Sequence, residues 1–219
     1  MFRVLLGIFG LTGIVIALPL LFAGGSLIWI DVTQTDANGF LNSTDMNIDV
    51  DGFALVAGPT EIETLPDMPS GPVSLGSIAT IRIQAENMDP DKGTFIGVAP
   101  TDTLDAYLGG VTYAVVEDTN PDGMFLTYRT NAAGEPLAPP AEQPFWSASA
   151  TGEGPQEVRW DVQEGNVSFV IMNEDASDGV SVEAEIGARI PLLRPVGEGL
   201  VLGAVAALGV GCLFLVMAL

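Results

Sequence analysis

Apolar residues are distributed along the chain in two ways, as continuous runs near both ends and in alternation with polar residues between them. No charged residue occurs from Val4 to Ile30. A second run extends from Val196 to Leu219 and holds one charge, Glu198. Because about 20 apolar residues span a bilayer as a helix, the pattern predicts one transmembrane helix within residues 1–30 and another within residues 194–219.

The first run has a rival interpretation as a cleaved secretory signal peptide. Such a peptide usually has an apolar core of about 7–15 residues that ends at a small-x-small cleavage site. Here the run is longer, and Gly24-Gly25-Ser26 is followed by more apolar residues, Leu27 to Ile30. These features favour a retained membrane anchor, with cleavage left open.

The flanking charges predict an orientation. Arg3 and the amino terminus favour the cytoplasmic side of a cell membrane, which places residues 31–193 in an extracytoplasmic domain. The second helix then returns the carboxyl terminus to the cytoplasm, as a closing anchor that needs no tail. Arg189 and Arg194 would lie on the outer side, where the bias counts less because a whole domain has already been translocated.

Between the helices, apolar and polar residues alternate in several short segments, which is typical of strands with one packed and one solvated face. Turn-forming sequences separate them: "DPDKG" at 89–93, "TNPDG" at 119–123, "QEGN" at 163–166 and "NEDASDG" at 173–179. We therefore expect a mainly β fold, an antiparallel jelly-roll-like β-sandwich over residues 31–193. The apolar positions of the alternating segments are Met46, Ile48 and Val50; Ile81, Ile83 and Ala85; Val158, Trp160 and Val162; and Val180, Val182, Ala184 and Ile186.

One short helix is expected at "PTDTLDAYLGG". Thr101 or Asp102 can cap its start, and Gly109 can end it. Leu104, Tyr107 and Leu108 share one face. The stretch at 131–144, rich in Pro and Ala, is predicted to be a surface loop.

Charge is concentrated in the predicted β domain. The formal net charge is −21, and 27 of the 28 acidic residues lie between Asp31 and Leu193 with only five of the seven basic ones. Molar salt shortens the Debye length to about 3 Å and relieves the resulting repulsion, so we interpret the surface as adapted to high salt. Nucleic acid is not expected as a partner, because the chain has no basic patch.

Two of the turns hold oxygen-bearing side chains in the alternation of a calcium loop. The first contains Asn87, Asp89 and Asp91, and the second Asn173, Asp175 and Asp178. Neither completes a twelve-residue calcium loop, since Val98 stands where a bidentate Glu is needed. Hairpin turns on an acidic surface are the favoured interpretation, calcium is the alternative, and no other cofactor is expected.

No catalytic motif is present. The chain lacks His, has no Gly-x-Ser-x-Gly pattern, and its one cysteine, Cys212, lies in the second apolar run. The templates for nucleophilic and metal-dependent hydrolysis therefore cannot be filled, and we do not expect an enzyme. Asn42-Ser43-Thr44 and Asn166-Val167-Ser168 fit the acceptor pattern for glycosylation, which an extracytoplasmic location would make usable.

Small residues recur along the second apolar run. Gly199, Gly203, Ala207 and Gly211 are spaced by four, which places them along one side of a helix where another helix can approach closely. Gly7, Gly10 and Gly13 form a looser stripe in the first run. We expect the two helices to pair with each other, and the stripes could also serve a homo-oligomer or a membrane-protein partner.

Two segments, "FIGVAPTDTLDAYLGGV" and "FWSASATGEGPQEVRWDVQEGNVSFVIMNEDASDGVSVEAEIGARIP", resemble a family of uncharacterised two-pass membrane proteins of halophilic archaea and high-GC bacteria. The resemblance implies the two-pass topology but no activity. Val167 stands where the family pattern has Trp, and Ala176 where it has Gly. The matching residues are Gly97, Ala99, Pro100, Asp105, Tyr107, Leu108, Trp146, Ser149, Gly152, Gly154, Trp160, Asp161, Gly165, Met172, Asn173, Asp175, Gly179, Val180 and Gly187.

The sequence thus leads to two functional hypotheses. In the first, the outward acidic domain is a non-enzymatic binding or assembly module at the cell surface, with the bilayer and a cell-surface layer as its surroundings. In the second, the chain is an accessory or sensor subunit of a larger membrane complex, and its outer domain binds a ligand or ion.

Overall fold

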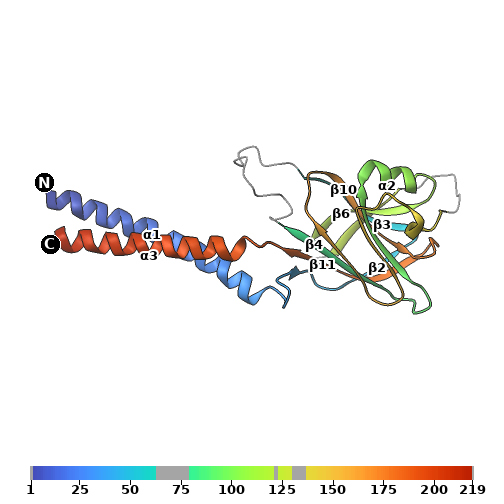
Figure 1. Cartoon of the computed structure of the whole chain (residues 1–219), viewed down its shortest axis with the longest axis horizontal. Coiled ribbons are helices and arrows are strands. Elements are labelled where there is room, and N and C mark those ends of the chain that lie inside the picture. The colour runs from blue at the N-terminus through green and yellow to red at the C-terminus, as the bar shows by residue number, and fades with distance from the viewer. Residues whose placement is uncertain (1, 63–78, 121–122, 130–136, 219) are drawn as a thin grey trace. The chain divides into compact units, whose positions relative to one another are not determined.

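The computed structural model describes residues 2–62, 79–120, 123–129 and 137–218. The chain forms two compact units, each treated by itself below (Figure 1). One is helical and contains the residues up to 41 and from 190 onward. The other is a β domain, Asn42–Arg189.

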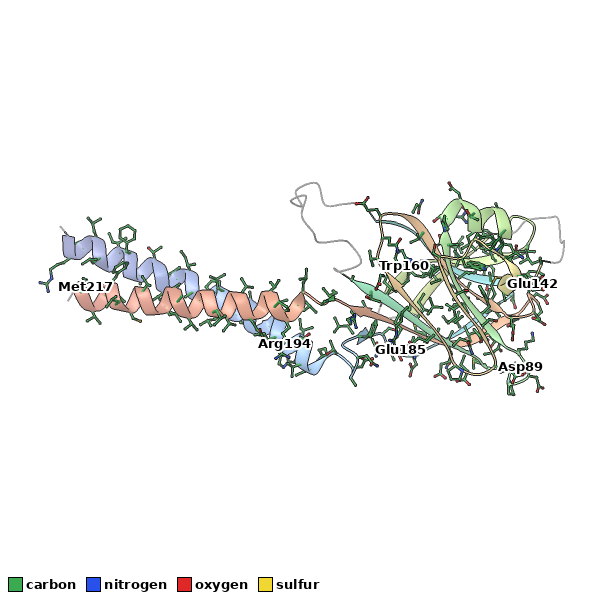
Figure 2. All side chains as sticks on the ribbon, viewed as in Figure 1. Asp89, Glu142, Trp160, Glu185, Arg194 and Met217 are labelled. Carbon is green, nitrogen blue, oxygen red and sulfur yellow. The ribbon has the colours of Figure 1, made fainter. Side chains whose placement is uncertain are left out.

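The helical unit consists of α1, Phe2–Thr33, and α3, Leu193–Ala218. Both helices are long and apolar enough to cross a membrane, with mean hydropathy of 2.5 for Arg3–Thr33 and 2.6 for Leu193–Ala218. Only 11% of the residues in either apolar window are buried, and the outward side chains are nearly all carbon (Figure 2). A core helix of a soluble protein would be mostly buried, so this exposure suits an apolar surrounding.

Small residues form the seam between these two helices. The buried positions of α1 are Gly10, Ala17 and Gly24, and those of α3 are Gly197, Ala204 and Gly211. A Cβ atom added at Gly10 would lie 2.7 Å from the carbonyl oxygen of Gly211, and one added at Gly24 would lie 2.7 Å from that of Gly197. The spacing of seven keeps one narrow stripe of each helix against the other along their length.

This seam differs from the predicted stripe of four-residue spacing on α3. Gly211 lies in the seam and the Ala207 carbonyl approaches Gly13, but nothing lies within 4 Å of a Cβ added at Gly199 or Gly203. Successive residues of an α-helix are rotated by about 100°, so positions four apart drift around the helix, whereas positions seven apart nearly return to the same side. The expected pairing of the two helices is observed, but Gly199 and Gly203 do not take part.

The β domain is a sandwich of two sheets. Sheet A contains β1 (Leu41–Asn42), β2 (Met46–Val50), β4 (Thr80–Asn87), β9 (Gln156–Asp161) and β11 (Val180–Arg189) in the order β1-β11-β4-β9, with β2 also on β11. Sheet B has the order β7-β6-β3-β10-β5-β8. Its strands are β3 (Ala54–Ile62), β5 (Thr94–Pro100), β6 (Tyr113–Asn120), β7 (Gly123–Arg129), β8 (Ala148–Gly152) and β10 (Gly165–Asn173). The predicted antiparallel, jelly-roll-like sandwich is therefore present, and β3 and β6 pair in parallel within it.

The predicted alternation separates the core from the outer face of sheet A. Ile48, Ile83, Trp160 and Val182 all belong to the main cluster between the sheets, and their polar neighbours in the sequence point away from it. Sheet B is packed on both faces, because its second face carries another apolar cluster under α2, Thr101–Leu108. The strands β5 and β10 accordingly have continuous buried runs.

The short helix lies where it was expected, but its predicted cap is wrong. Pro100 occupies the N-cap position and no side chain caps the helix. The Thr101 hydroxyl instead donates to Asn166 Oδ1 at 3.0 Å and lies 2.9 Å from the Ser168 hydroxyl. The Thr101 hydroxyl, which a cap would have used, is therefore bonded to β10 instead. Leu104 and Leu108 are buried as predicted.

The predicted turns join neighbouring strands. Residues 89–93 connect β4 to β5, residues 163–166 include the link from β9 to β10, and residues 173–179 lead from β10 to β11. The turn at 119–123 and the loop at 131–144 lie partly outside the described residues; within the loop, Pro140–Glu142 form a short 3₁₀ helix, η2.

The first and last segments of the β domain are neighbours. The Ser43 amide donates to the Ile186 carbonyl at 2.8 Å, and the Ile186 amide donates to Ser43 Oγ at 3.1 Å. The chain therefore enters and leaves this domain at the same edge of sheet A.

The seam between the helices predicts a specific cross-link. A Cβ added at Gly7 would lie 3.9 Å from Ala218 Cβ, within the range of about 3.5–4.5 Å found in disulfides. With Cys212 replaced by Ser, the pair Gly7→Cys and Ala218→Cys should form an intrachain disulfide when isolated membranes are treated with a mild thiol oxidant, which accepts the two electrons. Intact mass before and after reduction measures the product. The matched pair Gly7→Cys and Gly203→Cys should not; equal cross-linking of both pairs would contradict the seam.

A second prediction concerns the turn between β10 and β11. Ala176 has a φ of 58°, a left-handed conformation that costs a residue with a side chain about 1–2 kcal/mol. Ala176→Gly should therefore stabilise the domain by up to about 1 kcal/mol, because part of the gain is lost to the freer unfolded chain. Gly179, with a φ of 74° and nothing near its Cβ position, is the reverse control, since Gly179→Ala should destabilise. Thermal unfolding should show a higher melting temperature for Ala176→Gly and a lower one for Gly179→Ala.

Candidate binding face on sheet A

The outer face of sheet A is a polar surface ordered by strand register. Arg82 on β4 lies opposite Arg159 on β9. Gln84 lies between Glu157 on β9 and Glu185 on β11. Every second side chain of a strand lies on the same face of the sheet. Residues that are opposite each other on the three strands therefore form rows across this face, and the charge of successive rows changes from positive to negative.

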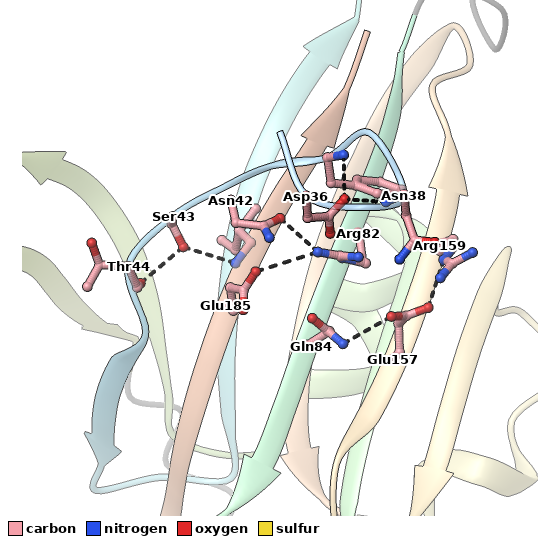
Figure 3. A network of polar contacts seen from close by, with 12 residues as sticks. Asp36, Asn38, Asn42, Ser43, Thr44, Arg82, Gln84, Glu157, Arg159 and Glu185 are labelled. Carbon is pink, nitrogen blue, oxygen red and sulfur yellow. Dashed lines mark hydrogen bonds and ion pairs between the residues drawn. The ribbon is translucent and has the colours of Figure 1, made fainter. Parts of the chain in front are cut away.

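Arg82 organises the basic end of this face. Its side chain is only 5% exposed although it belongs to the polar set of β4. Its Nη2 atom donates to Asn42 Oδ1 at 2.8 Å and lies 3.6 Å from Glu185 Oε1 (Figure 3). Removing a guanidinium from water is costly unless it is paired, so this network is what allows Arg82 to lie under the surface.

Arg159 takes a different environment on the neighbouring strand. Its side chain is 51% exposed and forms an ion pair with Glu157 at 2.7 Å. Glu157 also accepts a hydrogen bond from Gln84 Nε2 at 3.0 Å (Figure 3). Like charges directly opposite each other are unfavourable in a sheet, and here each arginine has its own carboxylate, which separates the two charges.

A hollow of about 230 Å³ lies at the acidic end of the face. It is lined by the side chains of Pro155, Asp45, Gln84, Glu86, Glu183 and Glu185. Ala85 and Ala184 also line it, and since their side chains point into the core, they contribute backbone. The floor of the hollow is therefore formed by backbone atoms, and four carboxylates surround it.

Two of these carboxylates oppose each other directly. Glu86 on β4 and Glu183 on β11 are register partners and both are exposed. Within the described part of the chain neither forms an ion pair. Opposed like charges cost stability, so the hollow holds negative charge that the fold itself does not neutralise.

The predicted calcium turns come together at one end of the sandwich. Asn87 Nδ2 donates to Asn173 Oδ1 at 2.8 Å, with both side chains buried. Asp89, Asp91, Asp175 and Asp178 are exposed around them. The structure thus joins the two asparagines and leaves the four aspartates outside their contact.

The Asn173 amide occupies the centre of this arrangement. Its Nδ2 atom lies 3.1 Å from the Ser177 carbonyl, 3.3 Å from that of Asp178 and 3.2 Å from that of Gly179. Its orientation follows from a relay, since Asn87 Oδ1 accepts from the Asp89 amide and Asn87 Nδ2 then faces Asn173 Oδ1. The Asn173 amide therefore holds together the carbonyls of the turn between β10 and β11.

The described aspartates around the two asparagines do not form a metal-binding cluster. Hydrogen bonds from Ser177 hold the pKa of Asp175 below its usual value, which is a local turn effect. Among residues 2–62, 79–120, 123–129 and 137–218, no group of three or more His, Cys, Asp or Glu side chains is arranged to hold a metal. Calcium binding by these turns stays a prediction.

The burial of Arg82 was not anticipated from the sequence, because strand alternation assigned it to solvent with Gln84 and Glu86. The sequence pattern does not distinguish the two arginines, because Arg159 also lies in an alternating strand and is 51% exposed.

Comparisons with known proteins give limited help. No family model matches the chain, and no curated protein matches it either. Among solved structures, it is similar to the Clostridium thermocellum N-terminal endo-1,4-beta-D-xylanase 10B CBM22-1-GH10 modules complexed with xylohexaose, at 10% identity and a TM-score of 0.24. The match covers 74% of this chain and 28% of that chain. At this level the likeness carries no argument about ligands.

The Arg82 network predicts unequal effects for the two opposed arginines. Arg82→Met should destabilise the β domain by about 2–4 kcal/mol, because it leaves Glu185 and Asn42 without their buried partner. Arg159→Met should cost less than about 1 kcal/mol, as exposed ion pairs do. Denaturant unfolding of both variants in the same buffer measures the difference, and similar losses would show that Arg82 is not the organising residue.

Proposed function

We propose that the chain is a two-pass cell-membrane protein whose β domain lies outside the cell and acts as a non-enzymatic binding module. In this proposal both termini are cytoplasmic, as the position of Arg3 favours. The two apolar helices that flank the β domain support membrane anchoring. The apolar core lies between the two sheets and leaves Glu86 and Glu183 exposed on the outer face of sheet A.

The observation that carries the binding role is the hollow with its opposed Glu86 and Glu183. The pair costs stability without serving the core, and a cationic group placed between the two carboxylates would relieve the repulsion. We therefore expect a partner that presents ammonium or guanidinium groups, such as a basic segment of a cell-surface or membrane protein. Shape and contact must contribute to such binding in molar salt, where charges act over only about 3 Å.

The first test is purification of the intact protein in mild detergent from native membranes kept at high salt, with partners identified by mass spectrometry. A basic cell-surface component would support the module as proposed. A stoichiometric membrane subunit bound through the helices would instead make the chain an accessory subunit. Isolation without a partner or as a homo-oligomer would require direct ligand assays on the outer domain, and turnover of a ligand would contradict the non-enzymatic role.

Variants of the hollow should increase the stability of the domain and weaken its binding to the partner. Glu86→Gln and Glu183→Gln should each raise the free energy of unfolding by a few tenths of a kcal/mol, because each removes one member of a like-charged pair. The same variants should weaken capture of the cationic partner by about two- to fivefold, as the loss of one exposed ion pair implies. Glu142→Gln in η2, also exposed, removes the same charge elsewhere and should leave capture unchanged.

The combination separates binding from folding. A variant that loses capture because it unfolds would show a lower free energy of unfolding, not a higher one. If Glu142→Gln weakens partner capture as much as the hollow variants do, the effect comes from the net charge of the domain. That result would contradict the hollow as the binding site.

A further inference from the structure

The two glycosylation acceptor patterns lie in different environments. Asn42 ends β1, and Ser43 and Thr44 follow it outside any regular strand. All three residues are exposed. The acceptor amide and the hydroxyl two residues later, which together define the pattern, are thus both on the surface of the folded domain.

The second pattern differs from the first in its hydroxyl. Asn166 is itself exposed, at the start of β10, and its register partner is Glu61 on β3. Ser168, which supplies the hydroxyl of this pattern, is 1% exposed. Its Oγ atom lies 2.9 Å from the Thr101 hydroxyl, which also donates to Asn166 Oδ1 at 3.0 Å. In the folded domain an enzyme cannot reach this hydroxyl without separating α2 from the sheet.

The hydrogen bond that Asn42 accepts from Arg82 is compatible with modification. Its Oδ1 atom accepts from Arg82 Nη2 at 2.8 Å, and attachment of a sugar to Nδ2 leaves that oxygen in place as an acceptor. A glycan at this position therefore does not require the buried Arg82 network to break.

We propose that Asn42 carries an N-linked glycan and that Asn166 does not. The donor is an oligosaccharide linked through phosphate to a polyprenyl lipid. A bond forms between Asn42 Nδ2 and C1 of the sugar, the bond from C1 to the phosphate oxygen breaks, and the polyprenyl phosphate leaves with the electron pair. The amide loses one proton in the exchange. The inference rests on the extracytoplasmic location in the proposed function, since transfer takes place on that side of the membrane.

The experiment uses the full chain isolated from its native membranes, with peptide mass spectrometry across Asn42 and Asn166. Thr44→Ala should abolish the added sugar mass on the Asn42 peptide, whereas Thr44→Ser should retain it, and neither change alters Asn42 itself. Both variants should unfold at the wild-type temperature, because Thr44 is exposed. Protease treatment of intact cells, followed by detection of the β domain, reports its location separately.

The outcomes are distinct. A sugar on Asn42 that disappears in Thr44→Ala, with Asn166 unmodified, supports the proposal. An unmodified Asn42 in a domain that external protease digests overturns the modification and leaves the proposed location intact. A domain that intact cells protect from protease overturns both, and a sugar on Asn166 shows that transfer precedes folding and overturns the selection between the two sites.

Discussion

The β domain depends on the two-residue period of its strands. In β4, β9 and β11 every second side chain enters the space between the sheets, and the residues between them form the outer face of sheet A. A shift of one residue would bring polar or charged side chains into the core and would expose Ile83 in β4, Trp160 in β9 or Val182 in β11. The register that protects the core is therefore the same register that aligns Arg82 with Arg159 and Glu86 with Glu183.

This coupling explains how far the sequence could be interpreted. Alternation predicted both the sandwich and the two faces of sheet A, since each face follows from parity. Alternation could not predict which residues lie opposite each other on neighbouring strands. Glu86 and Glu183 are partners because β4 and β11 are neighbours in the sheet, although they are far apart in the chain. The parallel pairing of β3 with β6 is equally a matter of long-range order.

Local patterns failed where a tertiary contact competed for the same group. Thr101 was expected to cap α2, but its hydroxyl bonds β10 instead. The spacing of four on α3 indicated a helix-packing face, but the antiparallel partner selected the spacing of seven, in which Gly197 and Ala204 take part. Ala176 adopts a left-handed conformation, which the turn sequence by itself did not predict.

The bonding of Ser43 to Ile186 places the two connections of the β domain side by side. A domain joined in this way behaves as an insertion in a helical hairpin, and the helices need no rearrangement when its loops change length. Recombination could exchange the whole sandwich for another domain with adjacent ends while the glycine seam of α1 and α3 is kept. The helical pair and the β domain are then free to evolve as separate parts.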